Sequence, residues 1–363
     1  MKILIITNHS YMLYRFRKEL IENLMESHEV VLSMPFQGHE EDFMAMGLKC
    51  LNTKMDRRGI NIKEDLKLCK GYDKLIREEN PDIVITYSIK PNVYAGAVCA
   101  KRNIPYFVNV QGLGTAFQRK GLAALVTLMY KFSLRKAKKV FFENTGNARE
   151  FINRKIIKED KTVVLSGAGI NLKEYAFTPY PENDKIHFLY LGRIMKEKGI
   201  DELFAAFKRL YSELGDKVQL DLVGFYDDDY EAKVNELVNE GLAVFYGFQS
   251  EPRPYYASAD CVVMPSYHEG LSNVLLEAAA MGRPIITTDI HGCKETVSDG
   301  ESGLLCKVQD EESLYQKMKE FTLLTMEQRK EMGIKAREKI EKEFDKQKVV
   351  EKTVAAVFEN CGK

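Results

Sequence analysis

The stretch Pro265–Pro284 combines residues that could bind a phosphate with a helix that could present them. It follows a short apolar run, turns at Gly270 and Leu271, and enters a helical pattern at Ser272 or Asn273. Ser and Asn are preferred at helix N-termini. The first turn of a helix offers backbone N–H groups and a positive dipole end, which together bind anions. The stretch therefore predicts a site for an anion such as a diphosphate.

Two carboxylates in this stretch, Glu269 and Glu277, are separated by seven residues. Glu269 precedes the helix and Glu277 falls about one turn inside it, so both could border the same site. A carboxylate beside a phosphate is unfavourable unless it has another use, such as accepting hydrogen bonds from sugar hydroxyls. Glu277 could equally be an ordinary exposed helix residue, because charged residues make up 29% of the chain.

Cations follow an earlier apolar run in a similar way. Gly192 comes directly after Ile186–Leu191, and Arg193 and Lys198 precede the next helical pattern. Arg presents a planar fork of donors and Lys a compact cation, which together suit two neighbouring phosphates. Taken alone, the two cations are more readily explained as solvated surface charge.

Joined together, these runs resemble the Glu-x7-Glu signature and the Gly-Arg…Lys-Gly element of retaining GT-B glycosyltransferases, in particular glycosyltransferase family 4. The pattern is most similar to bacterial enzymes that extend sugar chains on polyprenyl diphosphate for capsule, O-antigen or glycan assembly. The resemblance is strong over most of residues 160–305 and looser in the first half. Asn171 and Tyr175 stand where the family usually has Asp and Phe.

The resemblance implies transfer of a hexose or N-acetylhexosamine, with retention, from a nucleoside diphosphate sugar such as a UDP-sugar to a polyprenyl-diphosphate-linked saccharide. It makes Arg193, Lys198 and Glu269 the catalytic residues. The two cations would stabilise the leaving diphosphate electrostatically. Glu269 would bind the transferred sugar and Glu277 the ribose. The implied donor-binding set is Gly192, Arg193, Lys198, Gly270, Leu271, Ser272, Asn273 and Glu277.

Three consecutive aspartates, Asp227–Asp229, suggest a metal site, since Asp-x-Asp pairs bind the cation in the other main glycosyltransferase fold. However, Arg193 and Lys198 are already placed to neutralise a diphosphate. We therefore expect no metal and no other cofactor, and interpret the aspartates as a solvated loop or helix start.

Candidate acceptor contacts lie in the first half. His9 follows the apolar run Lys2–Thr7, and Gln111 and Gly112 end a later run. The first run is not followed by the Gly-rich loop of many relatives, and Gln111 is the polar residue nearest the position where many have a histidine. Gly112 and Gly114 permit close backbone approach. His9 could equally be a capping or surface histidine.

Short apolar runs alternate with helical patterns along the whole chain. Continuous apolar strands separated by helices predict parallel sheets covered on both faces. We expect an α/β fold of the GT-B type, with two Rossmann-like, doubly wound domains facing a cleft. The expected strands are 2–7, 30–34, 82–88, 106–111, 139–143, 162–165, 186–191, 218–223, 243–246, 261–265 and 284–288.

A chain of 363 residues is long enough for two domains. The polar segment Thr178–Asp184, with two prolines, is typical of an interdomain linker. We place an acceptor domain at 1–172 and a nucleotide-sugar domain at 173–345. A C-terminal helix at 346–363 could pack back on the first domain.

Charge differs sharply between the halves. Residues 1–172 carry 28 Lys/Arg and 18 Asp/Glu, a net charge of +10, and residues 173–363 carry 25 and 35, a net charge of −10. A basic half suggests an anionic partner, although solvated surface charge explains it equally well. Cations cluster at 119–120 and 131–139, with no acidic residue between them. We expect residues 119–139 to meet an anionic membrane surface.

A helical apolar stripe connects these two clusters, formed by Leu122, Leu125, Val126 and Met129. We expect it to pack on the sheet.

Seven cysteines without a Cys-x-x-Cys pair favour reduced thiols in the cytosol. No apolar stretch approaches the roughly 20 residues of a membrane span. The expected location is cytoplasmic, peripheral at the inner face of the cell membrane.

Two other functions stay open: a nucleotide-sugar epimerase of the same architecture, and a non-catalytic nucleotide-sugar-binding protein. An epimerase needs acid and base groups around the sugar, of which the first half offers few. A nicotinamide dehydrogenase is disfavoured because no Gly-x-Gly-x-x-Gly follows the first strand. Nucleic-acid binding is disfavoured because no aromatic residues are interleaved with the basic clusters.

Overall fold

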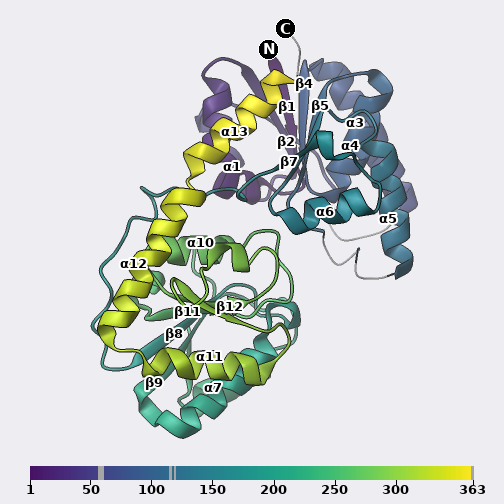
Figure 1. The fold of residues 1–363 in the computed structure, drawn as a ribbon. Helices are drawn as coiled ribbons and strands as arrows, with labels where there is room; N and C mark the ends of the chain where they lie inside the picture. Colours follow the sequence, from purple (N-terminus) through teal and green to yellow (C-terminus); the bar gives the residue numbers. More distant parts are fainter. Residues whose placement is uncertain (56–60, 114–116, 118–119, 361–363) are drawn as a thin grey trace. The chain divides into compact units, whose positions relative to one another are not determined.

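The computed structural model describes residues 1–55, 61–113, 117 and 120–360 and divides the chain into two compact units (Figure 1). Unit 1 contains residues 1–168 and the C-terminal helix from Lys346, and unit 2 contains Gly169–Asp345. The sequence pattern predicts this division after Leu172, whereas the structure has it after Ala168.

Unit 1 is built on a seven-stranded parallel sheet with the order β3-β2-β1-β4-β5-β6-β7. Its central strands are buried on both faces. Ile3 and Ile5 pack on one side of the sheet, and Leu4 and Ile6 on the other. This is why the sequence shows a continuous apolar run. The strands are β1 (Lys2–Ile6), β2 (Glu29–Met34), β3 (Lys49–Asn52), β4 (Ile83–Tyr87), β5 (Tyr106–Val110), β6 (Lys139–Phe142) and β7 (Thr162–Val164).

Helices cover both faces of this sheet. Helices α1 and α13 lie on one face, and α3, α4, α5 and α6 on the other (Figure 1). Apolar side chains of each set contribute to a separate core. The C-terminal helix α13 packs against α1, and its Val349, Val350 and Val357 are buried there. The helices are α1 (Ser10–Met25), α2 (Glu40–Ala45), α3 (Ile62–Glu79), α4 (Ile89–Arg102), α5 (Lys120–Ser133), α6 (Thr145–Asn153) and α13 (Lys346–Glu359).

Unit 2 repeats the plan with a six-stranded parallel sheet of order β10-β9-β8-β11-β12-β13. The order reverses direction at β8, as expected of a doubly wound sheet, and the carboxyl ends of β8 and its neighbour β11 lie at this switch point. The strands are β8 (Ile186–Leu191), β9 (Val218–Val223), β10 (Ala243–Phe245), β11 (Cys261–Met264), β12 (Ile285–Thr288) and β13 (Gly303–Cys306).

The helices of unit 2 also divide between two cores. Helices α7, α8 and α11 pack on one face of the sheet and α9 and α10 on the other. Helix α12 contributes side chains to both cores. Side-chain caps fix two helix starts, at Asp310 before α11 and at Thr325 before α12. The helices are α7 (Ile200–Leu214), α8 (Glu231–Asn239), α9 (Arg253–Ser258), α10 (Asn273–Ala280), α11 (Glu311–Leu323) and α12 (Met326–Glu343).

The predicted fold class, two doubly wound parallel-sheet domains, is confirmed. Two strands were not predicted, β3 and β13. Both have four residues and lie at or near a sheet edge, where a short run carries little periodicity.

The interpretation of Thr178–Asp184 as a linker is wrong, because this segment is bound to unit 2. The Thr178 N–H and hydroxyl donate to the Met281 carbonyl oxygen, and the Tyr180 hydroxyl donates to that of Asp260. The buried Arg283 guanidinium donates to Thr178 Oγ1 at 2.6 Å. These bonds hold the polar segment against the domain.

The predicted packing of the 122–129 stripe on the sheet is only partly right. Val126 is buried and Leu122 and Met129 are partly buried, but Leu125 is exposed. The buried side of the helix is centred on Ala123, Val126 and Tyr130, and Leu122 and Met129 pack against the same core.

The six cysteines within the described residues are free thiols, and four of them are buried; Cys361 lies outside the described residues. Burial raises the pKa of Cys50 to about 11 and of Cys99 to about 12, which makes these thiols poor nucleophiles. In the described parts of the chain, no helix is both long enough and apolar enough for a membrane span.

Candidate functional site

The loop after β8 carries the first group of predicted residues. It runs from Gly192 through Arg193 to a single helical turn at Lys196–Lys198, and Gly199 then leads into α7. Gly199 has a φ of 73°, and a Cβ at this position would lie 2.1 Å from the Pro265 carbonyl oxygen. A glycine is therefore required for the loop after β8 to lie against the loop after β11.

An ion pair joins these two loops. The Lys198 ammonium contacts the Glu269 carboxylate, and only 14% of each side chain is exposed. The Ser266 hydroxyl donates a hydrogen bond of 3.0 Å to the same Glu269 oxygen. The Tyr267 N–H donates to the Glu197 carbonyl oxygen at 2.9 Å, which fastens the backbones as well. The sheet thus brings together two predicted catalytic residues from distant parts of the sequence.

The loop after β12 supports Glu269 and Gly270 from the other side. A Cβ at Gly292, where φ is 93°, would lie 2.7 Å from the carbonyl oxygens of both residues. The Ser272 N–H donates to the Gly292 carbonyl oxygen at 2.8 Å. Glu269 and the start of α10 are therefore held by segments that follow three different strands.

Helix α10 starts at Asn273, as the sequence predicts, with Ser272 at the N-cap position. The Ser272 side chain does not cap the helix. Its hydroxyl is buried and points to Met264 Sδ at 3.0 Å, so it does not take up the backbone N–H groups of the first turn. Leu271 is buried beside it. An uncapped first turn keeps backbone donors available for an anion.

Glu277 is buried inside α10, with 6% of its surface exposed, which excludes the exposed-residue interpretation. Its Oε2 accepts a hydrogen bond of 2.9 Å from the Tyr256 hydroxyl of α9. A carboxylate is expensive to bury without hydrogen-bond partners, and one with a fixed orientation is well suited to bind neighbouring hydroxyls.

Arg193 is exposed and its guanidinium contacts the carboxylate of Asp227 at 2.7 Å. Asp228 accepts a hydrogen bond of 2.9 Å from the Lys196 N–H. These aspartates thus bind the loop after β8, and α8 begins later, at Glu231. Among the described residues, no three His, Cys, Asp or Glu side chains gather as ligands of a metal ion would.

Two exposed aromatic rings lie at the edge of the unit 2 sheet that also carries the loops after β8 and β11. Phe225 follows β9, Phe248 follows β10, and their ring centroids are 6.0 Å apart in an edge-to-face arrangement. Gly224 allows this loop to touch the loop after β8, since a Cβ there would lie 1.8 Å from the Gly192 carbonyl oxygen.

The predicted acceptor residues lie at the corresponding edge of the unit 1 sheet. His9 follows β1 at the N-cap position of α1, with its ring centroid 6.0 Å from that of Tyr11. Gln111 and Gly112 follow β5, which is separated from β1 by β4. Gly114, part of the same prediction, lies outside the described residues.

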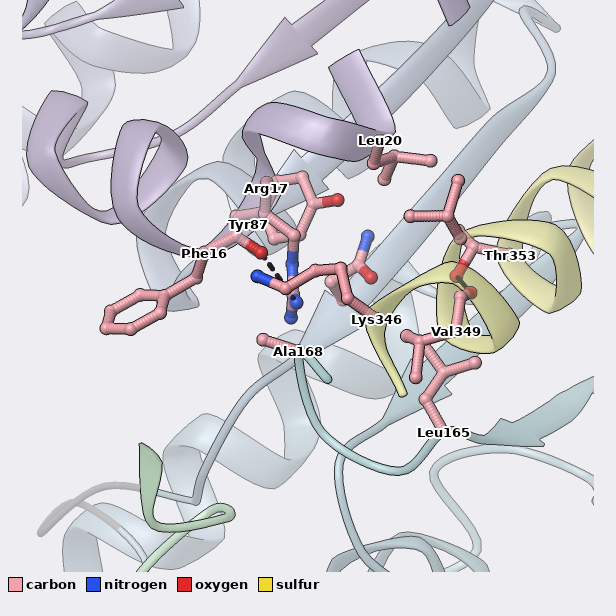
Figure 2. Close-up of a pocket in the computed structure, with 11 residues that line it drawn as sticks. Phe16, Arg17, Leu20, Tyr87, Leu165, Ala168, Lys346, Val349 and Thr353 are labelled. Carbon is pink, nitrogen blue, oxygen red and sulfur yellow. Dashed lines mark hydrogen bonds between the residues drawn. The ribbon is translucent and has the colours of Figure 1, made fainter. Parts of the chain in front are cut away.

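A pocket in unit 1 lies between α1 and α13 (Figure 2). Arg17 and Lys346 line it with apolar residues such as Val349, and both cations have acidic partners. Arg17 contacts Glu143 at 2.7 Å, and Lys346 contacts Glu19 at 3.4 Å. The pocket contains none of the predicted site residues.

Sequence reasoning missed the supporting partners Tyr256 and Ser266. Tyr256 lies 21 residues before Glu277, and nothing in the local pattern connects the two. Ser266 is only three residues before Glu269, in the same turn, and could have been found as a polar residue at a strand end. Asp227 was interpreted as part of a solvated loop or helix start, and not as the partner of Arg193.

The two halves of the chain match two descriptions of one kind of enzyme. Residues 185–322 match the family described as "Glycosyl transferases group 1", and residues 2–144 match "Glycosyl transferase 4-like".

Similar proteins agree with these matches. The N,N'-diacetylbacillosaminyl-diphospho-undecaprenol alpha-1,3-N-acetylgalactosaminyltransferase of Campylobacter jejuni is 29% identical over 339 residues, which cover 88% of both chains. The capsular polysaccharide biosynthesis glycosyltransferase CapM of Staphylococcus aureus is 27% identical over 80% of both. The structure of Anabaena HepE in complex with UDP matches 99% of this chain and all of its own, with a TM-score of 0.80 at 16% identity.

Proposed function

This chain belongs to the group 1, family 4 type of glycosyltransferase with the GT-B fold, and from that premise we propose a specific reaction for it. It transfers a hexose or N-acetylhexosamine from a nucleoside diphosphate sugar, with UDP as the preferred nucleotide, to a saccharide linked to polyprenyl diphosphate. The anomeric configuration is retained. The product belongs to a bacterial surface polysaccharide or glycan.

One observation carries the proposal: the Lys198–Glu269 ion pair lies in the loops at the carboxyl ends of β8 and β11, and the second loop leads into α10. A cation and an uncapped helix start suit a diphosphate, and the adjoining carboxylate suits sugar hydroxyls. Arg193, exposed on the first loop, supplies a second cation. The arrangement therefore offers separate binding groups for the two parts of the donor.

The remaining donor contacts follow from the same geometry. Glu277, oriented by Tyr256, accepts the ribose hydroxyls. The exposed rings of Phe225 and Phe248 offer a stacking surface for the base. The UDP complex of HepE and the substrate named for the Campylobacter relative support a UDP-sugar donor and a lipid-linked acceptor.

In the proposed reaction, the acceptor hydroxyl attacks C1 of the sugar from the face that the diphosphate leaves. The new bond to C1 forms as the C1–O bond to the diphosphate breaks, and a diphosphate oxygen takes the acceptor proton. Lys198, Arg193 and the N-terminus of α10 stabilise the negative charge that develops on the diphosphate. Such stabilisation contributes about 10²–10³-fold per group removed in comparable sites. No metal is required for this charge balance.

Unit 1 supplies the acceptor side, through His9, Gln111 and Gly112, in this proposal. Its excess of positive charge suits a lipid diphosphate and an anionic membrane surface. The enzyme accordingly works in the cytoplasm, at the inner face of the membrane, and residues 119–139 approach the lipid. Within that region, Arg119 lies outside the described residues.

Binding of donors tests the proposal without knowledge of the acceptor. Thermal unfolding is measured with a panel of UDP-, GDP- and dTDP-sugars, each with and without a chelator. We expect stabilisation by UDP and at least one UDP-sugar, unchanged by the chelator. An absence of stabilisation by every nucleotide sugar, or stabilisation that requires magnesium or manganese, would contradict the proposed donor site.

A further inference from the structure

Helix α5 has two apolar faces, and within the described residues only one is covered. The covered face lies in the unit 1 core beside α4, where Ala123, Val126 and Tyr130 are buried and Leu122 and Met129 are partly buried. The second face consists of Leu125, Leu128 and Phe132, whose exposed fractions are 49%, 65% and 64%. We call this second face the α5 stripe. Its spacing of three and four residues places the three side chains on one side of the helix.

An exposed stripe of this kind needs an explanation. Single exposed leucines are ordinary, and Leu323 in unit 2 is an example, with 77% of its surface exposed. Three large apolar side chains on consecutive turns of one helix form a continuous apolar surface instead. Contiguous exposed apolar surfaces mark contacts with another protein or with a membrane.

Positive charge borders the α5 stripe. Lys131, Arg135, Lys136 and Lys138 are exposed at this end of the helix, and the Arg135 guanidinium lies 5.9 Å from the centroid of the Phe132 ring. The sequence contains no Asp or Glu between Asp82 and Glu143. Apolar side chains flanked by cations alone are the arrangement by which an amphipathic helix lies in an anionic lipid interface.

We propose that α5 is the membrane-contacting element of this protein. The α5 stripe enters the boundary between headgroups and acyl chains, and Lys131 and Arg135 contact the lipid phosphates. The inference rests on the proposed function for the identity of the partner, a bilayer that carries the acceptor. It goes further in one respect: apolar insertion, as well as charge, holds the enzyme at the membrane.

Salt dependence separates the two contributions. Attraction between exposed charges weakens strongly as salt rises from about 0.1 M to about 0.5 M, whereas burial of apolar side chains does not. The experiment measures binding of the full chain to vesicles of phosphatidylcholine with about one third phosphatidylglycerol at both salt concentrations. The variants are a triple Leu125→Ser, Leu128→Ser, Phe132→Ser change, and a charge variant with Lys131, Arg135, Lys136 and Lys138 changed to Gln. Leu323→Ser is the matched control.

We expect the wild type and Leu323→Ser to keep measurable binding at high salt. The triple variant should bind at least about tenfold more weakly and lose its remaining binding at high salt, because only electrostatic attraction is left. The charge variant should lose mainly the low-salt binding. The inference is overturned if the triple variant binds like the wild type at both salt concentrations, or if high salt abolishes wild-type binding altogether.

Two further measurements separate membrane binding from turnover and from oligomerisation. With a water-soluble acceptor that carries a short prenyl chain, the triple variant should turn over within about twofold of the wild type, because the stripe lies outside the proposed site. If the wild type shows no turnover with this acceptor, the proposed function is wrong, whatever the membrane-binding result. Light scattering without lipid gives the oligomeric state. A wild-type dimer that the triple variant converts to a monomer would show that the stripe is a protein interface and overturn the inference.

Discussion

The Lys198 ammonium and the Glu269 carboxylate form a mostly buried ion pair between residues 71 positions apart in the sequence. Each comes from the loop at the carboxyl end of a strand, and β8 and β11 are neighbours in the sheet. In the proposed reaction this pair is where the diphosphate and the transferred sugar meet. The ion pair should therefore contribute both to the stability of unit 2 and to the reaction.

Lys198→Met should affect both properties. We expect kcat to fall by about 10²-fold or more, and the free energy of unfolding to fall by about 1–3 kcal/mol because Glu269 stays buried without its cation. The double variant Lys198→Met, Glu269→Gln should recover most of the stability and none of the activity. Urea unfolding and turnover on the same preparations check this. A folded Lys198→Met protein with near-normal turnover would show that Lys198 does not contact the diphosphate.

Glu277→Gln should weaken donor binding while Tyr256→Phe changes it little. The carboxylate is the stronger acceptor for two ribose hydroxyls, and hydrogen bonds to charged groups contribute about 1.5–3 kcal/mol, or about 10- to 100-fold in Kd. Tyr256 only orients it, through one hydrogen bond. Calorimetric titration with UDP measures both variants. Equal losses in the two would mean that the buried network, rather than a ribose contact, sets the affinity.

A pair of glycine substitutions tests how the two loops are joined. Gly241→Ala, at a φ of 72° with nothing within 4 Å of the added Cβ, should cost only the backbone strain of about 1–2 kcal/mol. Gly199→Ala has a similar φ, but its Cβ would lie 2.1 Å from the Pro265 carbonyl oxygen. It should be more destabilising and should also weaken UDP binding by displacing Lys198. Indistinguishable unfolding curves for the two variants would contradict the close approach of the loops.

Sequence patterns predicted the strand ends well and the contacts across the fold poorly. Arg193, Lys198 and Glu269 were placed correctly in the loops after their strands, and Glu277 inside a helix, because a strand end or a helix start lies within a few residues of each. The linker interpretation failed because the side chain that holds Thr178, Arg283, comes 105 residues later. Similarly, a helix with apolar residues on two faces does not reveal from its periodicity which face is buried, and the prediction for Leu125 was wrong for that reason.

The stability of unit 2 should depend on pH through His187. Its hydrogen bond to Asp221, 2.7 Å from Nδ1 to Oδ2, raises the pKa of His187 above its usual value of about 6.5. The protonated form is thus favoured by folding. Its contribution is complete below the unfolded pKa and is lost as pH rises through the higher folded pKa. Unfolding midpoints across this pH range should fall for the wild type and stay flatter for His187→Gln.

His28 in unit 1 provides the opposite case. Burial lowers its pKa, so its contribution is present above the usual pKa and lost as pH falls. His28→Gln should therefore leave unchanged the fall of the unfolding midpoint of unit 2 at higher pH. If His187→Gln keeps the wild-type slope, another group is responsible for it.

The central claim is that this protein moves a sugar from a UDP-sugar to a diphosphate-linked saccharide with retention. The most direct measurement incubates the enzyme with an α-configured UDP-N-acetylhexosamine or UDP-hexose and a prenyl-diphosphate-linked saccharide, then assigns the new linkage by NMR. We predict release of UDP only when the acceptor is present, and an α linkage in the product. A β-linked product, or an epimerised sugar formed without acceptor, would contradict the account.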